Sequence, residues 1–375
     1  MPKRFDCAVI GLGLAGSATL DALARRGISA IGLDQFSLRH AKGSSHGVTR
    51  LLRVAYFEAK ALTPWARHAV SLWKALEHRR KTKLFFGGSG VLCGGQAHSE
   101  FLESTREAAA AHSVRFTDLD SCPPQFDFGE DFRFAVDHEA GYVRAEASLQ
   151  AFQDEAILNG AIIRDQCRCL SIEPANGRVL ISTEGGDIDA GHVVVTTGAW
   201  VSELLPDLAP FCYTERQVLY WFRDEARRFL AENGFRPFAV EVDGHLFYGF
   251  PTDGDNLVKV ADHNAGVRVG SISEVGSVLT NDDLEGITSF VERHMPLLGP
   301  FDRHVVCMYP QAQDDMFILD RHPSRANVTI GVGLSGHGFK FGPAIGEALA
   351  NFATNGQQVD AFPRDLVSIR RFLAN

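Results

Sequence analysis

The sequence lacks the excess of positive charge that nucleic-acid-binding proteins carry. Among its 375 residues, 37 are Lys or Arg and 46 are Asp or Glu, so the net charge is -9 at pH 7. Nucleic-acid backbones are bound by basic surfaces, and this balance argues against a nucleic-acid partner. The chain also lacks an uncharged stretch long enough to span a bilayer, so no membrane segment is expected.

Cysteine is sparse, and its spacing is irregular. The seven cysteines are an odd number, and Cys167 and Cys169 are the only close pair. No second pair and no cluster of histidines completes a zinc site, so we expect no metal. Reduced thiols are typical of a cytoplasmic protein, and we expect that location for this chain.

Internal repeats and low-complexity linkers are absent as well. The length exceeds the size at which one hydrophobic core usually keeps growing, so two domains are expected. The apolar fraction of 45% and the charged fraction of 22% are those of an ordinary soluble globular protein.

Glycine, in contrast, follows a recognisable spacing near the N-terminus. A predicted buried strand over residues 5–10 is followed by GLGLAG, which holds Gly11, Gly13 and Gly16. In a dinucleotide-binding turn the first glycine allows the tight turn, and the second lets the backbone approach a pyrophosphate. The third lets the helix pack closely on the strand. That helix directs its free N–H groups and its positive dipole end at the phosphates.

Asp34 ends the next predicted strand, ISAIGLD, and completes the pattern. A carboxylate in this place binds ribose hydroxyls and disfavours a phosphorylated ribose. The strand, turn, helix and acid together predict a dinucleotide site, for which NAD and FAD are both open at this point. Gly198, within VVVTTGAW, is a second place where the backbone is expected to lie close to a bulky group.

The rest of the chain predicts helices and a second sheet. TPWARHAVSLWKALEHRR is an amphipathic helix whose apolar stripe includes Trp65 and Trp73 as core residues. Residues 217–260 contain alternating strands, which predict an antiparallel sheet with one face available to cover a ligand. The expected domains are a discontinuous nucleotide-binding domain of residues 1–83, 145–212 and 305–375 and a substrate domain of residues 84–144 and 213–304.

Four segments concentrate polar residues that could carry chemistry. These residues are His46, Arg50 and Arg53, then Tyr248, Lys259 and His263, then Cys307 and Tyr309, and finally His337 and Lys340. Each has a structural alternative. The arginines could pair with surface carboxylates, Lys259 could stand on the solvent face of an edge strand, and the histidines could be satisfied in the core. Cys307 could be a small apolar residue on a buried strand.

Their combination suggests a different interpretation. An arginine, a lysine and a tyrosine from distant segments would clamp a carboxylate. A lysine and an arginine beside a flavin ring would stabilise its anionic reduced form and a nascent superoxide.

On these motifs the chain resembles the monomeric sarcosine oxidase and N-methyltryptophan oxidase family, within the D-amino-acid-oxidase-like flavoproteins. The resemblance covers nearly the whole chain, through AVIGLGLAG, GSSHGVTRLLR, TTGAW, YGFP, CMY and SGHGFKF. It implies an α/β fold with a Rossmann-like FAD-binding domain and an inserted domain that holds a mixed or antiparallel sheet. It also implies FAD attached to the protein through the cysteine of CMY, here Cys307, at the flavin 8-methyl group.

The resemblance implies roles for residues near the flavin. Lys259 is similar to the lysine that activates dioxygen over one flavin face, and His46 and Arg50 are similar to the pair that tunes the ring. The residues implied for the cofactor are Gly11, Gly13, Gly16, Asp34, Ser44, Arg50, Gly198, Cys307, Gly336, Gly338 and Lys340.

It also implies a substrate site. Arg53 and Lys340 are similar to the carboxylate clamp, and Tyr248 and His263 are similar to the residues beside the substrate amine. The spacing from Tyr248 through Lys259 to His263 matches the family without a gap. Gly336 and Ala239 complete the implied substrate-binding set.

Three positions depart from the sarcosine oxidase pattern. Ser45 stands where those enzymes have a histidine, Pro310 follows CMY in place of threonine, and Ala239 replaces methionine in FAVEV. The departures bear on the substrate more than on the chemistry. An alanine in place of methionine predicts a pocket for a side chain larger than that of sarcosine, unless a neighbouring residue fills the space.

The implied activity is oxidation of a secondary amine, most simply an N-methyl or cyclic amino acid. The products are an imine, which water hydrolyses to formaldehyde and the demethylated amine, and hydrogen peroxide. A monomer is expected. Two alternatives remain open: a flavin dehydrogenase that passes electrons to a protein or quinone, and a flavin-binding subunit without turnover of its own.

Overall fold

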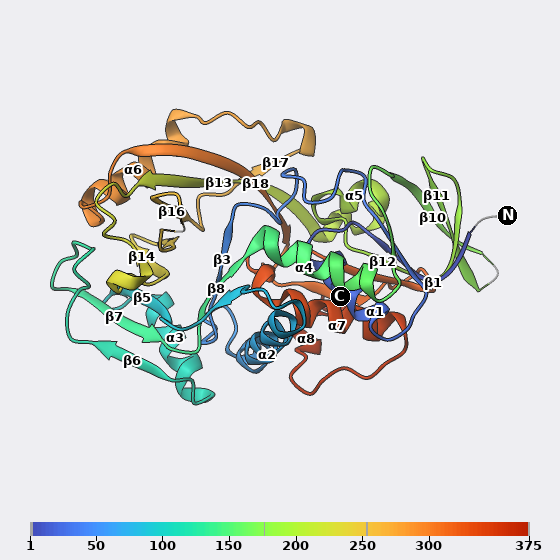
Figure 1. The fold of residues 1–375 in the computed structure, drawn as a ribbon, viewed down its shortest axis with the longest axis horizontal. Coiled ribbons are helices and arrows are strands. Elements are labelled where there is room, and N and C mark those ends of the chain that lie inside the picture. Colours follow the sequence, from blue (N-terminus) through green and yellow to red (C-terminus); the bar gives the residue numbers. More distant parts are fainter. Residues whose placement is uncertain (1–2, 176, 253, 374–375) are drawn as a thin grey trace.

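The computed structural model describes residues 3–175, 177–252 and 254–373 (Figure 1). In that part of the chain the strands form two large sheets and one small sheet. Figure 1 shows the first sheet on the right, around β1 and β12, and the second on the left, around β5, β7 and β14. None of the helices in these ranges is long and apolar enough to cross a membrane.

The first sheet carries the glycine-rich turn. Its strands are β1 (Lys3–Ile10), β2 (Ala30–Leu33), β9 (Ile162–Arg164), β10 (Cys169–Ala175), β11 (Arg178–Thr183), β12 (Ile188–Val195), β19 (Ile318–Arg321) and β20 (Val328–Val332). β1 pairs in parallel with β2 and β12, and β12 pairs in parallel with β20. Parallel strands end at the same edge of a sheet, so the loops after them gather there and form the expected place for a ligand.

Helices cover this sheet because its strands are apolar on both faces. The residues of β2 and β20 are all buried, which is typical of parallel strands in the middle of a layered fold. The helix α1 (Leu14–Ala24) packs against α4 (Ala145–Leu158) and α7 (Gly342–Ala353), and α2 (Thr63–Arg80) packs against α7. Trp65 and Trp73 of α2 are fully buried, as the amphipathic pattern predicted.

The second sheet is mixed. Its strands are β5 (Val91–Gln96), β6 (Phe116–Leu119), β7 (Phe132–Asp137), β13 (Cys212–Arg223), β14 (Phe238–Val242), β15 (His245–Gly249), β16 (Leu257–Asp262), β17 (Val267–Val269) and β18 (Phe301–Ala312). The pairs β13–β16, β15–β16 and β14–β15 are antiparallel, which confirms the prediction for residues 217–260. Only β14 and β5 pair in parallel among the described strands of this sheet.

The long strands β13 and β18 join the two halves of the molecule. They pair from Cys212 opposite Ala312 to Phe222 opposite Phe301. Cys212 and Ala312 lie in the apolar core of the first sheet, whereas Phe222 lies in that of the second. Cys307, on the middle of β18, therefore lies between the two apolar cores, in a smaller cluster of its own.

A small sheet completes the fold, with β3 (Thr49–Leu52) and β4 (Phe85–Phe86) on either side of β8 (Gly141–Arg144). The remaining helices are α3 (Glu100–Ala111), α5 (Val201–Leu204), α6 (Asn281–His294) and α8 (Arg364–Val367). The expected fold class, a Rossmann-like sheet with a second, mixed sheet inserted, is confirmed by this arrangement and by the fold of known proteins described below. The domain boundaries stay a prediction.

Candidate active site

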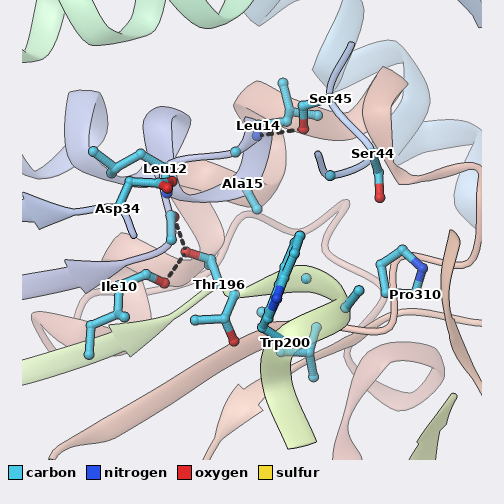
Figure 2. Close-up of a pocket in the computed structure, with 18 of the residues that line it drawn as sticks. Ile10, Leu12, Leu14, Ala15, Asp34, Ser44, Ser45, Thr196, Trp200 and Pro310 are labelled. Carbon is cyan, nitrogen blue, oxygen red and sulfur yellow. Dashed lines mark hydrogen bonds between the residues drawn. The ribbon is translucent and has the colours of Figure 1, made fainter. Parts of the chain in front are cut away.

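The turn between β1 and α1 has no room for side chains at two of its glycines. Gly11 has φ +91°, and a Cβ there would lie 2.6 Å from the carbonyl oxygen of Thr196. A Cβ on Gly16 would lie 1.8 Å from the carbonyl oxygen of Gly11. Thr196 fixes the turn, because its hydroxyl donates to the carbonyls of Ile10 and Gly11 at 3.1 and 2.8 Å (Figure 2).

The N-terminus of α1 opens into the same groove. Gly13 precedes the helix, and its Cβ would lie 3.2 Å from the Ser45 hydroxyl, so a side chain there would narrow the approach. The backbone N–H of Leu14 donates to that hydroxyl at 3.1 Å (Figure 2). Ser45, which departs from the sarcosine oxidase pattern, thus binds one of the free N–H groups at the helix start.

Asp34 lies beside the glycine turn at the end of β2. Its Oδ2 accepts the N–H of Leu12 at 2.8 Å, and its Oδ1 accepts the N–H of Phe36 at 2.9 Å. These two bonds fix the carboxylate and leave lone pairs for hydroxyl groups, because an ionised carboxylate offers about four acceptor sites. Gly198, with φ +55°, lines the same groove.

The groove extends from the glycine turn to the region between the two sheets. Its lining includes Gly11, Gly13, Asp34, Arg39, Ser44, Arg50, Trp200, Tyr309, Pro310, Gly336, Gly338 and Phe339. Figure 2 shows Asp34, Ser44, Trp200 and Pro310 around this groove. The two glycines without room for a side chain, the helix N-terminus and the fixed carboxylate suit the phosphates and ribose of a dinucleotide. The residues present therefore fit FAD.

Cys307 lies on β18 beside this groove. It is 1% exposed, and its Sγ is 3.9 Å from the carbonyl oxygen of Gly43 and 4.0 Å from Arg50 Nη2. Burial raises the pKa of the thiol, while Arg50 and Lys259 act in the opposite direction. Because Gly43 and Arg50 both line the groove, the thiol stands next to the space where a flavin would lie.

His46 lies within a short turn, residues 44–50, that runs past the thiol, and Arg50 ends it on β3. Arg50 donates to the carbonyls of Thr49 and Ser44 at 2.8 and 2.9 Å, and also to that of His46. The Ser44 hydroxyl donates to the carbonyl of Met308, which ties the turn to β18. Burial and then Arg50 lower the pKa of His46 to about 4, so this imidazole is neutral at pH 7.

Lys259 lies across the turn, on β16. The alternative that it stands on the solvent face of an edge strand is wrong, because β16 lies between β13 and β15 and Lys259 is 3% exposed. Its Nζ donates to the carbonyls of Gly47 and Thr49 at 2.8 and 2.9 Å. Burial and the positive charge of Arg50 lower its pKa well below the usual value.

A second, smaller cavity shares a wall with the groove. Its lining is Arg50, Leu51, Arg53, Glu58, Ala239, Leu246, Tyr248, His263, Tyr309, Gly336, His337, Phe339 and Lys340. Arg50, Tyr309, Gly336 and Phe339 line both spaces. Five of the residues predicted for substrate binding, namely Arg53, Lys340, Tyr248, Ala239 and Gly336, are thus brought together, and His263 joins them.

Gly336 lines both the groove and the smaller cavity, at a point where there is no room for a side chain. It has φ +67°, and a Cβ there would lie 2.4 Å from the Tyr309 ring. Tyr309 in turn lies beside Tyr248, with their hydroxyls 3.4 Å apart, and beside His263, with ring centroids 6.1 Å apart. Burial lowers the pKa of His263 to about 4. Gly338 lies at the start of the short 3₁₀ helix that carries Lys340.

The cations of this cavity share one carboxylate. Arg53 is 4% exposed and contacts Glu58 at 2.5 Å, from Nη2 to Oε1. Although burial raises the pKa of Glu58, the charge of Arg53, followed by the smaller effects of His337 and Lys340, lowers it to about 2. Burial and Arg53 lower the pKa of Lys340 to about 7.

Lys340 is held by a chain of hydrogen bonds. Its Nζ donates to the carbonyl of His337 at 2.9 Å and to the hydroxyl of Tyr56 at 3.4 Å. That hydroxyl lies 2.5 Å from His337 Nδ1, and His337 Nε2 lies 2.7 Å from the carbonyl of Asp315. Because a carbonyl can only accept, His337 carries its proton on Nε2 and accepts from Tyr56.

Sequence reasoning missed Glu58 and Tyr56 as members of this site. Acidic side chains are rarely buried, so a glutamate in FEAK predicts a surface position. Only the spacing of five residues from Arg53 to Glu58 could have suggested a pair, and that spacing has no fixed meaning outside a helix. Tyr56 gave no signal beyond its aromatic character.

Comparisons with known proteins agree with this geometry. The chain matches the family model described as FAD dependent oxidoreductase over residues 6–352. It is 32% identical over 368 residues to the monomeric sarcosine oxidase of Bacillus sp. (strain NS-129), covering 95% of each chain. It is also 32% identical over 357 residues to the N-methyl-L-tryptophan oxidase of Yersinia pestis (strain Pestoides F), covering 93% of this chain and 95% of the relative.

Solved structures share the fold. NikD, an unusual amino acid oxidase essential for nikkomycin biosynthesis, superposes with a TM-score of 0.83 at 20% identity, over 98% of this chain and 97% of that one. L-proline dehydrogenase from P. horikoshii superposes with a TM-score of 0.84 at 18% identity, over 100% of both chains.

Proposed function

This chain belongs to the family of FAD dependent oxidoreductases, and from that premise we propose that it is an oxidase of secondary amines that carry a carboxylate. The preferred substrate is an N-methyl or cyclic amino acid bulkier than sarcosine, and dioxygen is the electron acceptor. The names of the two relatives, a sarcosine oxidase and an N-methyltryptophan oxidase, support this substrate class. The first name also supports a monomer.

One observation carries the proposal: a buried arginine donor with nothing to bind. Arg53 Nη1 is inaccessible to solvent and has no hydrogen-bond partner in the described part of the chain. Glu58 is the one carboxylate in the cavity lining, where it stands against the two cations Arg53 and Lys340. A buried charge without a full set of partners is costly, and a substrate carboxylate would supply the missing acceptor in a bidentate geometry.

The same cavity also offers partners for the rest of an amino acid. With its carboxylate on Arg53 and Lys340, the amine is directed toward the neutral His263 and the Tyr248 hydroxyl. The N-methyl carbon then points to the wall shared with the cofactor groove, at Tyr309. Fixing the reacting carbon in this way converts a bimolecular encounter into an oriented one, which supplies much of the rate.

The cofactor would be held by the glycine turn, Asp34 and the N-terminus of α1, with Cys307 as its covalent attachment point. FAD supplies the two-electron acceptor that takes a hydride from the carbon next to nitrogen. Arg50, which lines the groove, and Lys259, which binds the carbonyls of Gly47 and Thr49, would supply positive charge near the ring, where it favours the formation of anionic oxygen species. The net reaction converts the amine to an imine, which water hydrolyses, and converts dioxygen to hydrogen peroxide.

Ala239 supports a substrate larger than sarcosine. It lies on β14, is fully buried, and lines the cavity. It pairs with Tyr248 of β15, so its position relative to the substrate amine is fixed by the strand register. A methionine there would extend into the cavity, whereas alanine leaves that space to a substrate side chain.

A peroxide assay tests the proposal. We expect hydrogen peroxide in equal amount to the amine consumed when the holoenzyme turns over N-methylated or cyclic amino acids with large side chains. Sarcosine should be a weaker substrate, and primary amino acids weaker still. Flavin reduction by these amines without peroxide, but with transfer to a quinone dye, would instead establish a dehydrogenase. If none of these amines reduces the flavin, the protein would be a flavin-binding protein without turnover of its own.

A further inference from the structure

The turn that faces Lys259 holds a backbone conformation that its sequence disfavours. Val48 has φ +68°, in the left-handed region, and the N–H of Thr49 donates to the carbonyl of Gly47 at 2.8 Å. A hydrogen bond from residue i+2 to residue i around a central residue with positive φ is a γ-turn of the rare, strained kind. A β-branched residue in this conformation is a genuine outlier, which persists only where its surroundings hold it.

The surroundings that hold it are on α4. Glu146 Oε1 accepts the N–H of Gly47 at 2.7 Å, and its Oε2 accepts the N–H of Val48 at 3.1 Å. The N–H of Ala145 donates to the carbonyl of Val48 at 2.8 Å. The hairpin explains this contact: β3 begins at Thr49 and pairs with β8 at Arg144, so the first residues of α4 lie against the turn before β3.

The opposite side of the turn faces Lys259. The carbonyls of Gly47 and Thr49 both accept hydrogen bonds from Nζ, and they point the same way because the γ-turn reverses the chain between them. Lys259 has no carboxylate among its hydrogen-bond or ion-pair partners in the described ranges. Apart from the two carbonyls, its contacts include the rings of Trp221 and Phe250, with Nζ at 5.7 and 5.1 Å from their centroids.

We propose that Glu146 is the positioning residue for Lys259: by binding the amides of Gly47 and Val48, it holds the carbonyls of Gly47 and Thr49 against the lysine. This inference rests on the proposed role of Lys259 toward dioxygen and deepens it. Glu146 does not touch the groove or the substrate cavity, so it acts only through the turn and through its charge.

The negative charge of Glu146 also affects the pKa of Lys259. The groups that face this lysine are Arg50 on β3, His46 in the turn, Cys307 on β18 and Glu146 on α4. Burial and Arg50 lower the pKa of Lys259, whereas Cys307 and Glu146 raise it. If the sulfur of Cys307 is tied into a thioether it carries no charge, which leaves Glu146 as the group that raises the pKa of this lysine.

Two variants separate these effects. Glu146→Gln keeps an oxygen for the Gly47 amide but loses the charge, and Glu146→Ala loses both. Hydrogen exchange of the holoenzyme is followed in peptides that span residues 44–50, and flavin reduction and reoxidation are measured by stopped flow. Glu100→Ala is the matched control, because Glu100 is also an acid in the first turn of a helix but lies on α3, outside both cavities.

We expect Glu146→Ala to accelerate exchange of the Gly47 and Val48 amides about tenfold or more, as for loss of a charge-assisted hydrogen bond. Its reoxidation should slow more than its reduction. Glu146→Gln should retain most of the amide protection, while the pH above which reoxidation declines should fall, because removal of the negative charge lowers the pKa of Lys259. Replacing Val48 by glycine in Glu146→Ala should restore part of the reoxidation rate, since glycine adopts positive φ without strain.

Unchanged exchange at the turn in Glu146→Ala would overturn the proposal. So would unchanged reoxidation in that variant if Lys259→Met reoxidises slowly. If Lys259→Met reoxidises at the native rate, the role of the lysine toward dioxygen is wrong, and the exchange data still decide whether Glu146 holds the turn.

Discussion

At the scale of single residues, the site is defined by buried cations that share too few anions. Arg53 and Lys340 are 4% and 5% exposed, yet Glu58 is the only carboxylate among the residues that line the substrate cavity. Lys259 is 3% exposed, and its Nζ donates to two backbone carbonyls. Such groups lower the stability of the free enzyme, because a buried charge loses its hydration. We attribute the burial of these cations to the anions that they would bind or stabilise during the reaction.

The pKa of Lys340, lowered to about 7 by burial and Arg53, predicts how substrate affinity depends on pH. Below pH 7 the lysine is charged and contributes to carboxylate binding, and above pH 7 the free enzyme loses this charge. KM should therefore rise between pH 7 and pH 9 while kcat changes little. Lys340→Arg should flatten this profile, because a guanidinium stays charged throughout the range.

Steady-state kinetics of the native enzyme and of Lys340→Arg check this prediction. Lys74→Arg on the exposed face of α2 is the control, and it should keep the native profile. A KM of the native enzyme that is constant from pH 6 to pH 9 would show that Lys340 does not titrate in the free enzyme.

The lowered pKa of Lys340 also makes the free energy of unfolding depend on pH. Between pH 7 and the usual pKa of a lysine, the unfolded chain binds a proton at Lys340 that the folded chain does not. Through this group alone, the free energy of unfolding rises with pH across that window. The cost of burying Lys340 is thus fully present below pH 7, where the substrate carboxylate would offset it.

At the scale of secondary-structure elements, strand register decides which side chains reach the substrate. Ala239 of β14 lies opposite Tyr248 of β15 and beside Cys93 of β5. Ala239→Met should reduce kcat/KM for a bulky N-methyl amino acid more than for sarcosine. Each methylene that is excluded from an apolar pocket is worth about 1–3 kcal/mol, so a change of at least ~10-fold in the ratio is expected.

Substrate profiles of the two proteins, with thermal unfolding to confirm that the variant folds, measure this effect. An unchanged ranking would mean that a neighbouring side chain such as Leu246 already closes the space. A native preference for sarcosine would contradict the enlarged pocket directly.

The position of Cys307 on β18 leads to a second prediction at this scale. It places Cys307 against Gly43 and Arg50, beside the groove. Acid denaturation should therefore give a yellow pellet, because a thioether to the flavin survives denaturation. Cys307→Ser should give a colourless pellet, whereas Cys212→Ser, on the neighbouring strand β13, should stay yellow. Free flavin in the supernatant of the native protein would show that the cofactor is not attached.

At the scale of the whole molecule, the sequence predicted those elements that follow from a local pattern of residues. The glycine spacing and Asp34 predicted the first sheet and its groove, and the alternation in LVKVA predicted β16, although it left open whether Lys259 is buried. Glu58 and Glu146 were beyond reach, because their burial follows from tertiary contacts between segments that are distant in sequence or in different elements. Val48 was also beyond reach, since nothing about a valine indicates a left-handed backbone.

The proposed activity depends on the substrate carboxylate being bound by Arg53 and Lys340 next to the cofactor groove. Anaerobic reduction of the flavin tests this most directly, with a bulky N-methyl amino acid compared with its uncharged carboxamide. Leaving a buried charge pair incomplete costs about 2–5 kcal/mol, so the acid should reduce the flavin with a kcat/KM at least ~30-fold above that of the carboxamide. Equal values for the acid and the carboxamide, or no bleaching by any secondary amino acid, would contradict the account.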